Sequence, residues 1–376
     1  MIDFVTPCFV FDTDKLKNHV LNMKNVLGER AKICFAMKAN QTLLPDLKNL
    51  VDCVEVCSPG EFRFCEKTKV DYKKIVLSGV FKEETDLDRI MGLCKTDCVY
   101  TVESLTQANL LKKLATKYNI TIHVCLRLSC GNQFGMDETD LFKIIETRQD
   151  YPFDISGIQY YSGTQKKTEK IVSEIKKLKD FINILNEKFD FKTRRLEYGP
   201  ALKINYFEAK EDAENQLLAL KQSLNEIDES VEIVLETGRF LVAGCGSYFT
   251  KIVDAKITEG NNYLIVDGGI NHLNYYGQLM AMKIPYHEFH KTSPSGEKKN
   301  YTVCGSLCTS ADVIIKNLPL DNAQIGDIIE FKNTGAYSVT EGIYMFLLRD
   351  MPRIYKIKNG KPSLERDFIK TDEIIF

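Results

Sequence analysis

The sequence lacks the features that would mark an exported, membrane-bound or nucleic-acid-binding protein. No run of about 18 apolar residues occurs in the chain, so no membrane-spanning helix is expected. The first residues, Met1–Phe4, do not begin the basic segment and apolar run of a signal peptide. A formal net charge of -2 gives no electrostatic attraction for nucleic acid or for an acidic membrane. We therefore expect a cytoplasmic protein without nucleic-acid or membrane partners.

Cysteine is present at 12 positions, but not in a pattern that binds metal. Cys94 and Cys98 have i, i+4 spacing, as have Cys304 and Cys308, and neither pair is matched by a second pair of cysteines or histidines at zinc-ligand spacing. Other cysteines, such as Cys34, lie inside apolar runs. In a chain without an export signal this favours reduced, buried thiols over a disulfide scaffold. No metal site is expected.

Short apolar runs alternate with longer amphipathic segments from about residue 13 to 240. Several of the runs are hydrophobic on both faces, as parallel strands covered by helices should be. Segments such as 103–118 and 167–189 carry apolar residues at three- and four-residue steps, which predicts amphipathic helices between the strands. The eight candidate strands are 33–37, 51–57, 74–77, 98–101, 121–128, 155–161, 195–198 and 231–236.

Eight strand–helix units in succession predict an α/β fold with a (β/α)8 TIM-type barrel. The alternative is an open doubly wound sheet, but the first strand–helix turn, 37–41, has no glycine and so is not a dinucleotide-binding fingerprint. After about residue 245 the runs become short, β-rich and separated by Gly, Asn, Asp and Pro, which predicts an all-β domain. We expect a barrel over 12–244 and a β domain made of 1–11 and 245–376, because the opening run 8–11 could pair into that domain.

Polar residues follow several of the predicted strands. Lys38 stands at the end of the first one. A lysine there is usually the point at which the chain meets water, but it could also be a desolvated amine that forms a Schiff base with an aldehyde cofactor. In a parallel barrel, functional groups collect at the carboxyl ends of the strands, where Lys38 falls.

Three later strands end in segments that could present backbone N–H groups to a phosphate: 162–165, 197–201 and 236–239. The alternative is that Gly199 and Gly238 simply make tight turns. Glu236 ends an apolar run, so its carboxylate should be half buried and should need a partner. A protonated pyridine nitrogen would serve, and so would Arg239.

Taken together, these segments resemble the fold-III pyridoxal-phosphate enzymes, the alanine racemase-like group. The similarity is greater to the decarboxylase branch, which includes diaminopimelate and ornithine/arginine decarboxylases. It covers nearly the whole chain in order. It rests on Ala36–Asn40, Glu55–Glu61, Arg127 with Phe134-Gly135, Glu236–Arg239, Cys308–Asp312 and Gly335–Tyr337.

The resemblance implies pyridoxal 5′-phosphate as cofactor and a homodimer with a shared active site. Lys38 would hold the cofactor, Glu236 would pair with its ring nitrogen, and Cys308 from the partner subunit would protonate the substrate carbon. The cofactor-binding residues that it implies are Lys38, Glu55, Arg127, Tyr161, Thr164, Gly199, Glu236, Thr237, Gly238, Arg239 and Tyr337.

The chain also departs from the family pattern. Tyr161 stands where the family has a histidine stacked on the ring, and Gly199 is what remains of a triple glycine. Thr309 replaces an acidic residue that contacts basic substrates, and the stretch 274–280 lacks the arginine expected for a distal carboxylate. We expect decarboxylation of an α-amino acid with a non-standard distal group, free or tethered to a carrier protein.

Two alternatives remain open from the sequence. One is an amino-acid racemase of the same fold, in which Lys38 and a residue such as Cys308 or Tyr337 would be the two bases. The other is a non-catalytic pyridoxal-phosphate-binding protein, against which the β domain argues.

Overall fold

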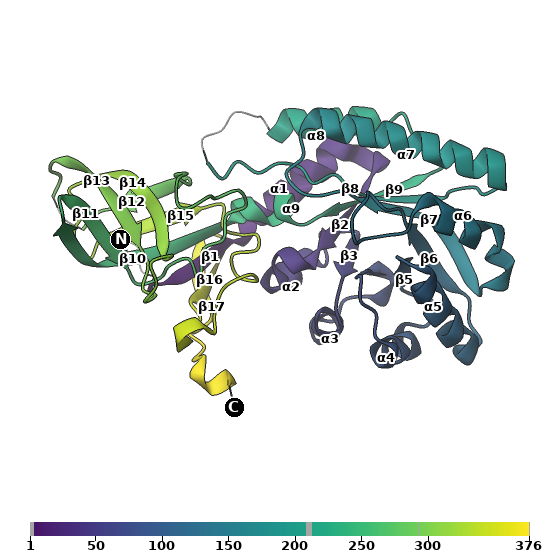
Figure 1. Ribbon diagram of the computed structural model, residues 1–376, viewed down its shortest axis with the longest axis horizontal. Coiled ribbons are helices and arrows are strands. Elements are labelled where there is room, and N and C mark those ends of the chain that lie inside the picture. Colours follow the sequence, from purple (N-terminus) through teal and green to yellow (C-terminus); the bar gives the residue numbers. More distant parts are fainter. Residues whose placement is uncertain (1–3, 208–212, 293, 376) are drawn as a thin grey trace. The chain divides into compact units, whose positions relative to one another are not determined.

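The computed structural model describes residues 4–207, 213–292 and 294–375 (Figure 1). These residues form two compact units. One unit comprises 19–203 and 213–240, and the other comprises 4–18, 204–207, 241–292 and 294–375.

The first unit contains a closed barrel of parallel strands in chain order, β2 to β9, in which β9 pairs with β2. This closure confirms the predicted (β/α)8 barrel and excludes the open doubly wound sheet, and each of the eight apolar runs forms a strand. The strands are β2 Lys32–Ala36, β3 Cys53–Val56, β4 Ile75–Leu77, β5 Val99–Val102, β6 Ile122–Arg127, β7 Phe153–Tyr161, β8 Arg195–Gly199 and β9 Glu232–Thr237.

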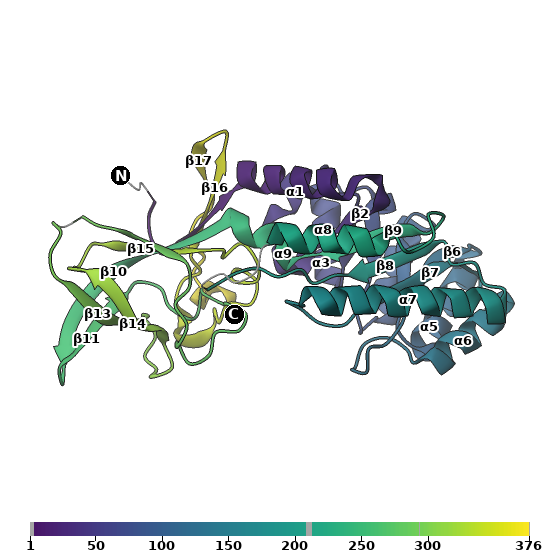
Figure 2. The ribbon, with the colours of Figure 1, turned by 90° about the horizontal axis from the view of Figure 1, so that it is seen from above.

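Helices follow the barrel strands and bury one apolar stripe each. Helix α7 shows the pattern most fully, with Ile171, Ile175, Leu178 and Leu185 buried at three-, four- and seven-residue steps. Helices α7 and α8 lie side by side (Figure 2). None of the helices in the described ranges is long and apolar enough to cross a membrane. The helices are α1 Thr13–Leu27, α2 Leu44–Leu47, α3 Pro59–Thr68, α4 Glu84–Cys94, α5 Leu105–Tyr118, α6 Glu138–Glu146, α7 Thr168–Phe189, α8 Ala213–Leu224 and α9 Arg239–Val242.

The second unit is built on a mostly antiparallel sheet, as the β-rich texture predicts. The opening run does pair into it, because β1 lies between β10, to which it is antiparallel, and β16, to which it is parallel. The sheet strands are β1 Cys8–Asp12, β10 Gly246–Thr258, β11 Asn261–Val266, β12 His287–His290, β13 Lys298–Cys304, β14 Val313–Asp321, β15 Ile328–Lys332, β16 Arg353–Lys358 and β17 Lys361–Arg366.

Three of these strands, β12, β14 and β17, have weak strand signals in the sequence. Strand β12 has only four residues, and β14 carries Pro319 within it. Strand β17 buries none of its side chains, so it shows no alternation of apolar and polar residues.

Gly157 in β7 is a residue on which the barrel depends. A β-carbon at this position would overlap the backbone carbonyl of Arg195 in β8, and backbone in a closed barrel has little room to yield. We expect Gly157→Ala to lower the free energy of unfolding by about 3 kcal/mol, measured by urea denaturation. Gly60→Ala is the control, because its β-carbon would lie 3.7 Å from the nearest atom. Equal losses in the two variants would contradict this account.

Candidate active site

The carboxyl ends of the barrel strands bring most of the predicted residues together. Lys38 lies in a 3-10 turn, Met37–Ala39, that directly follows β2. The register places Ala36 beside Glu55 of β3, and Cys34 beside Glu236 of β9. Lys38, Glu55 and Glu236 therefore share one rim of the barrel.

Lys38 forms an ion pair with Glu55, 2.8 Å from Nζ to Oε2, and its Nζ lies 3.7 Å from Sγ of Cys57. Loss of solvent lowers the pKa of Lys38, but Glu55, with Cys57 and Glu236, outweighs this and holds that pKa well above its usual value. Burial raises the pKa of Glu55, yet the charge and hydrogen bond of Lys38, together with Arg127 and Cys57, outweigh burial and leave that pKa below the usual range. The pair is therefore ionised.

The turn after β3 is held by a helix cap. Ser58 accepts a hydrogen bond from the backbone N–H of Glu61, with Pro59 at the first position of α3, and the Glu61 carboxylate accepts from the N–H of Cys57 at 2.7 Å. This cap explains much of the segment Glu55–Glu61, and it fixes Cys57 beside Lys38.

Glu236 is buried on β9, and within the described residues its hydrogen bond comes from the neutral amide Nε2 of Gln159 on β7. Burial raises the pKa of Glu236 to about 8, and the charges of Glu55 and Glu197 add to the rise. The same Nε2 also donates to Oγ of Ser78 at 3.1 Å. The glutamine within the apolar run 155–161 was the one sequence signal for this contact.

The ends of β7, β8 and β9 pack tightly against one another. Tyr161 pairs with Gly199 in register, and a β-carbon on Gly199 would overlap the Tyr161 ring. A β-carbon on Gly238 would lie 3.1 Å from Cβ of Ala39, so the chain after β9 packs against the turn that carries Lys38. Close packing therefore requires glycine at position 199 and leaves little room for a side chain at position 238.

Two further contacts tie the chain after β9 to its neighbours. Nε of Arg239 donates to Oγ1 of Thr164 at 3.4 Å, and the hydroxyl of Thr237 donates to the carbonyl of Cys34 at 3.4 Å. Thr164, Thr237, Gly238 and Arg239 therefore gather where β7, β9 and β2 end.

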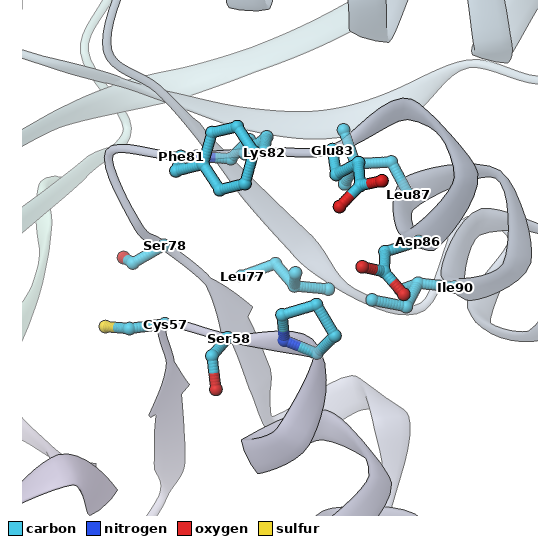
Figure 3. Close-up of a pocket in the computed structure, with 11 residues that line it drawn as sticks. Cys57, Ser58, Leu77, Ser78, Phe81, Lys82, Glu83, Asp86, Leu87 and Ile90 are labelled. Atoms are coloured by element: carbon cyan, nitrogen blue, oxygen red, sulfur yellow. The ribbon is translucent and has the colours of Figure 1, made fainter.

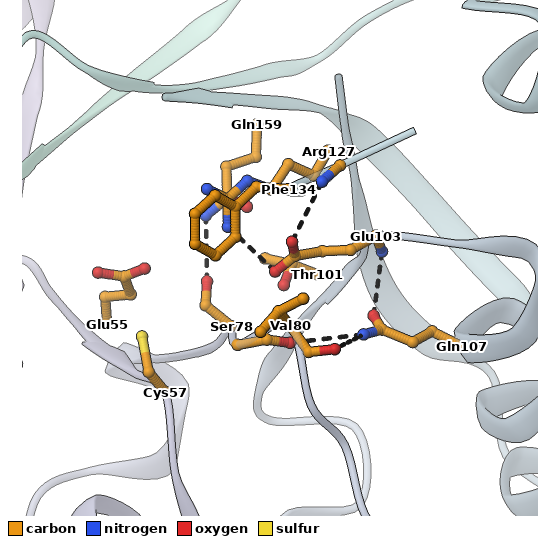
Figure 4. Close-up of polar contacts among 12 residues, drawn as sticks. Glu55, Cys57, Ser78, Val80, Thr101, Glu103, Gln107, Arg127, Phe134 and Gln159 are labelled. Atoms are coloured by element: carbon orange, nitrogen blue, oxygen red, sulfur yellow. Dashed lines mark hydrogen bonds and ion pairs between the residues drawn. The ribbon is translucent and has the colours of Figure 1, made fainter. Parts of the chain in front are cut away.

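Arg127, at the end of β6, is part of a buried polar network (Figure 4). Its Nη1 donates to Glu103 at 3.0 Å, and its guanidinium lies 4.8 Å from the centre of the Phe134 ring. The other oxygen of Glu103 accepts from the N–H of Gly135 at 3.2 Å. Glu103, which the sequence reasoning missed, thus anchors the Phe134-Gly135 turn over the barrel.

A second lysine lies at the same rim, beside a small pocket lined by Cys57, Ser78 and Phe81 among others (Figure 3). Lys82 Nζ donates to the carbonyl of Gly79 at 2.7 Å and to Oε1 of Gln107 at 3.1 Å. Desolvation lowers the pKa of Lys82 to about 8. Its place after the fourth strand, where barrel side chains gather, was the signal that could have identified it.

In the β-domain unit, Cys308 is exposed on a loop that a buried carboxylate organises. Asp312 accepts the backbone N–H of Ile270 at 2.9 Å and that of Leu307 at 2.8 Å. A β-carbon on Gly305 would overlap this carboxylate. Tyr337 of the same unit has a left-handed backbone, with φ of 68°, and its carbonyl accepts from the N–H of Glu341 at 2.8 Å.

Three side chains that could ligate a metal, Glu288, His290 and Glu330, come together on β12 and β15. Lys332 lies among them, with Nζ 3.1 Å from Glu288 and 2.6 Å from Glu330. His290 is 2.8 Å from Glu330. Lys332 is thus an ion-pair partner of both carboxylates.

The comparisons with known proteins agree with this geometry. The family model described as "Pyridoxal-dependent decarboxylase, C-terminal sheet domain" matches residues 8–335. L-glutamyl-[BtrI acyl-carrier protein] decarboxylase of Niallia circulans is 25% identical, over 99% of this chain and 93% of its own. The 2-[(L-alanin-3-ylcarbamoyl)methyl]-2-hydroxybutanedioate decarboxylase of Staphylococcus aureus is 26% identical, over 94% of each. The solved diaminopimelate decarboxylase of Methanocaldococcus jannaschii has the same fold, with a TM-score of 0.88 at 23% identity over 99% of this chain and 92% of its own.

The chain belongs to the pyridoxal-dependent decarboxylase family. It is an amino-acid decarboxylase, as the resemblance indicated, and the racemase and the non-catalytic binding protein are not favoured.

Proposed function

We propose that the barrel binds pyridoxal 5′-phosphate through Lys38 and decarboxylates an α-amino acid whose distal group is neutral or amide-linked. The observation that carries this proposal is Glu236. It is a buried carboxylate at the rim beside Lys38 and Glu55, and it has a neutral hydrogen-bond donor but no ion pair within the described residues. Such a group needs a cation to be stable when charged.

The side chains at this rim fit the cofactor. Lys38 supplies an amine for its aldehyde, and Glu236 supplies a carboxylate that a protonated ring nitrogen would neutralise. When bound, pyridoxal phosphate supplies an electron-accepting ring that stabilises the charge left at Cα as carbon dioxide leaves.

The family resemblance gives each remaining residue a role. Tyr161 would stack on the ring, and Arg127 and Glu55 would line it. Thr164, Gly199, Thr237, Gly238, Arg239 and Tyr337 would surround the phosphate.

The two lysines allow a sharp test of the attachment site. We expect wild-type protein and Lys82→Ala to absorb in the visible with cofactor bound, and Lys38→Ala to lose that absorption. Borohydride reduction followed by peptide mapping should label Lys38. Lys82 is the competing amine, because its lowered pKa alone would favour it over Lys38. Labelling of Lys82 in place of Lys38 would overturn the assignment.

We also propose that the active unit is a homodimer in which Cys308 of the partner subunit donates a proton to the substrate Cα from its thiol. This proposal is supported by the exposure of Cys308 and by the hydrogen bond through which the buried Asp312 holds its loop. The same unit exposes large apolar side chains, which a partner surface would cover: Tyr276, Leu279, Met280, Met282, Ile343, Met345, Phe346, Leu347 and Leu348.

Mixed dimers test the shared site. Lys38→Ala and Cys308→Ala should each be inactive, and mixing them with subunit exchange should restore about one quarter of wild-type activity. Half of the re-associated dimers would be hybrids, each with one complete site. Mixing Lys38→Ala with Glu236→Gln is the control and should restore nothing, because both residues come from one barrel. Recovery in the control, or none in the test pair, would count against sharing.

The substrate proposal rests on the β-domain segments that the family uses for recognition. Thr309 is uncharged, and 274–280 contains no lysine or arginine. Two charged groups contact this stretch but have partners there: Lys283 Nζ donates to the carbonyl of Gly277 at 2.7 Å, and Glu341 accepts from Asn274. The N. circulans and S. aureus relatives act on a carrier-bound glutamyl group and on a carbamoyl compound, which supports an amide-linked or carrier-tethered substrate here.

A substrate panel tests this choice. We expect kcat/KM for diaminopimelate, ornithine, lysine and arginine to stay below about 10⁴ M⁻¹s⁻¹. Amide-linked analogues, free and carrier-bound, should exceed them. Efficient turnover of any of the four charged acids would refute the proposed distal group and leave the cofactor assignment intact.

We further propose a cytoplasmic location, which the free cysteines support. All 12 are unbridged, and most are buried.

A further inference from the structure

We propose that Glu197 is a positioning residue that carries a proton, and that through Gln159 it holds Glu236 ionised and aimed at the cofactor. The chain of contacts would run from the Glu197 hydroxyl to Oε1 of Gln159, and from Nε2 of Gln159 to Glu236. This inference rests on the proposed function only in its last contact, that of Glu236 with the ring nitrogen.

The first support is a pair of buried oxygens that have no hydrogen-bond partner within the part of the chain that the structure describes. They are Oε1 of Gln159 and Oε2 of Glu197. Gln159 is 1% exposed and Glu197 is 0% exposed. Leaving such groups unpaired costs free energy, because each loses its water without a replacement.

The second support is that these two residues are neighbours. Strands β7 and β8 are parallel, and Gln159 is directly beside Glu197 in their register. Side chains at paired positions of adjacent strands point to the same face. A carboxylate and an amide oxygen can only accept, so a proton on Glu197 would turn two unpaired acceptors into one hydrogen bond.

The third support is the pairing of the charges next to Glu197 and Glu236. Arg195 lies 2.6 Å from Glu197 and 2.8 Å from Glu232, and Lys38 pairs with Glu55. Arg195 is thus divided between two carboxylates, and Glu236 has no ion pair within the described residues. Two buried negative charges that are so incompletely paired are costly, so one of these two carboxyl groups, Glu197 or Glu236, should be neutral.

Glu197 is better suited to be that group than Glu236. Glu236 already receives a hydrogen bond that an anion accepts well, whereas Oε2 of Glu197 has none. Burial raises the pKa of Glu197 although Arg195 opposes the rise, and Glu55 and Glu232 add to it. The titratable and charged groups around Glu197 are Cys34, Cys53, Glu55, Cys125, Arg195, Glu232 and Glu236.

A neutral Glu197 also helps Glu236. The charge of Glu197 is one of the causes that raise the pKa of Glu236. Protonating Glu197 removes that cause, so Glu236 keeps its charge at a lower pH. Gln159, with its oxygen held by Glu197, must then present Nε2 to Glu236.

Infrared spectroscopy of the cofactor-free protein tests the proton directly. We expect the C=O band of a buried carboxylic acid at pH 9, above the pKa of about 8 of Glu236, in wild type and in Glu236→Gln, and its loss in Glu197→Gln. Glu174→Gln is the control and should keep the band, because Glu174 is equally buried but pairs with Lys166 at 2.8 Å. Survival of the band in Glu197→Gln with loss in Glu236→Gln would overturn the proposal. So would the absence of any acid band in wild type, which would point to a bridging water.

Two matched variants test the positioning. Glu197→Gln keeps a donor for Gln159, and Glu197→Met does not, while both remove the carboxylate beside Arg195. We expect Glu197→Gln to bind pyridoxal phosphate within about twofold of wild type, and Glu197→Met to bind it about tenfold more weakly, which corresponds to one lost hydrogen bond. Equal affinities would refute the role. If Glu197→Met does not fold, Gln159→Met, which removes the same link, should show the same weakening.

The two proposals fail in different ways. If wild-type protein does not bind pyridoxal phosphate, the proposed function fails, but the infrared result still decides whether Glu197 carries the proton.

Discussion

Glu236 is a buried carboxylate with no ion pair among the described residues, and much of the site is arranged around it. Lys38 neutralises Glu55, and Arg195 serves both Glu197 and Glu232, so Glu236 is left with a neutral amide. A buried charge without a counter-charge is costly and persists only where function uses it. The carboxylate of Glu236 is therefore the reason that we propose a ligand which brings positive charge to that point of the rim.

The rest of the rim is held in place by packing and by buried polar contacts. Position 199 is a glycine because the Tyr161 ring occupies the space that a side chain would need. The carboxylate of Glu103 accepts a hydrogen bond from the N–H of Gly135 and so holds that turn. Both contacts are made between residues of the chain itself. Such preorganisation lowers the entropic cost of binding.

Much of the fold and part of the site could be predicted from the sequence, for reasons that particular residues make clear. The apolar runs located all eight barrel strands, because a parallel strand buried on both faces leaves few polar residues. Lys38 and Glu236 could be identified because they end such runs. Gln159 and Glu197 could not, since their meaning depends on the register of β7 against β8. Lys82 was missed although it follows the fourth strand, because its lowered pKa arises only from the folded surroundings.

The loop that carries Cys308 has a consequence for how such enzymes diversify. Asp312 holds this loop mainly through the backbone N–H groups of Leu307 and Ile270. Oγ1 of Thr309 adds a bond inside the loop, because it accepts from the N–H of Ala311 at 3.3 Å. On the roles proposed for Cys308 and Thr309, substitutions at 309–311 that keep a hydroxyl at 309 would change the substrate contacts without rebuilding the proton donor, and a protein engineer could begin there.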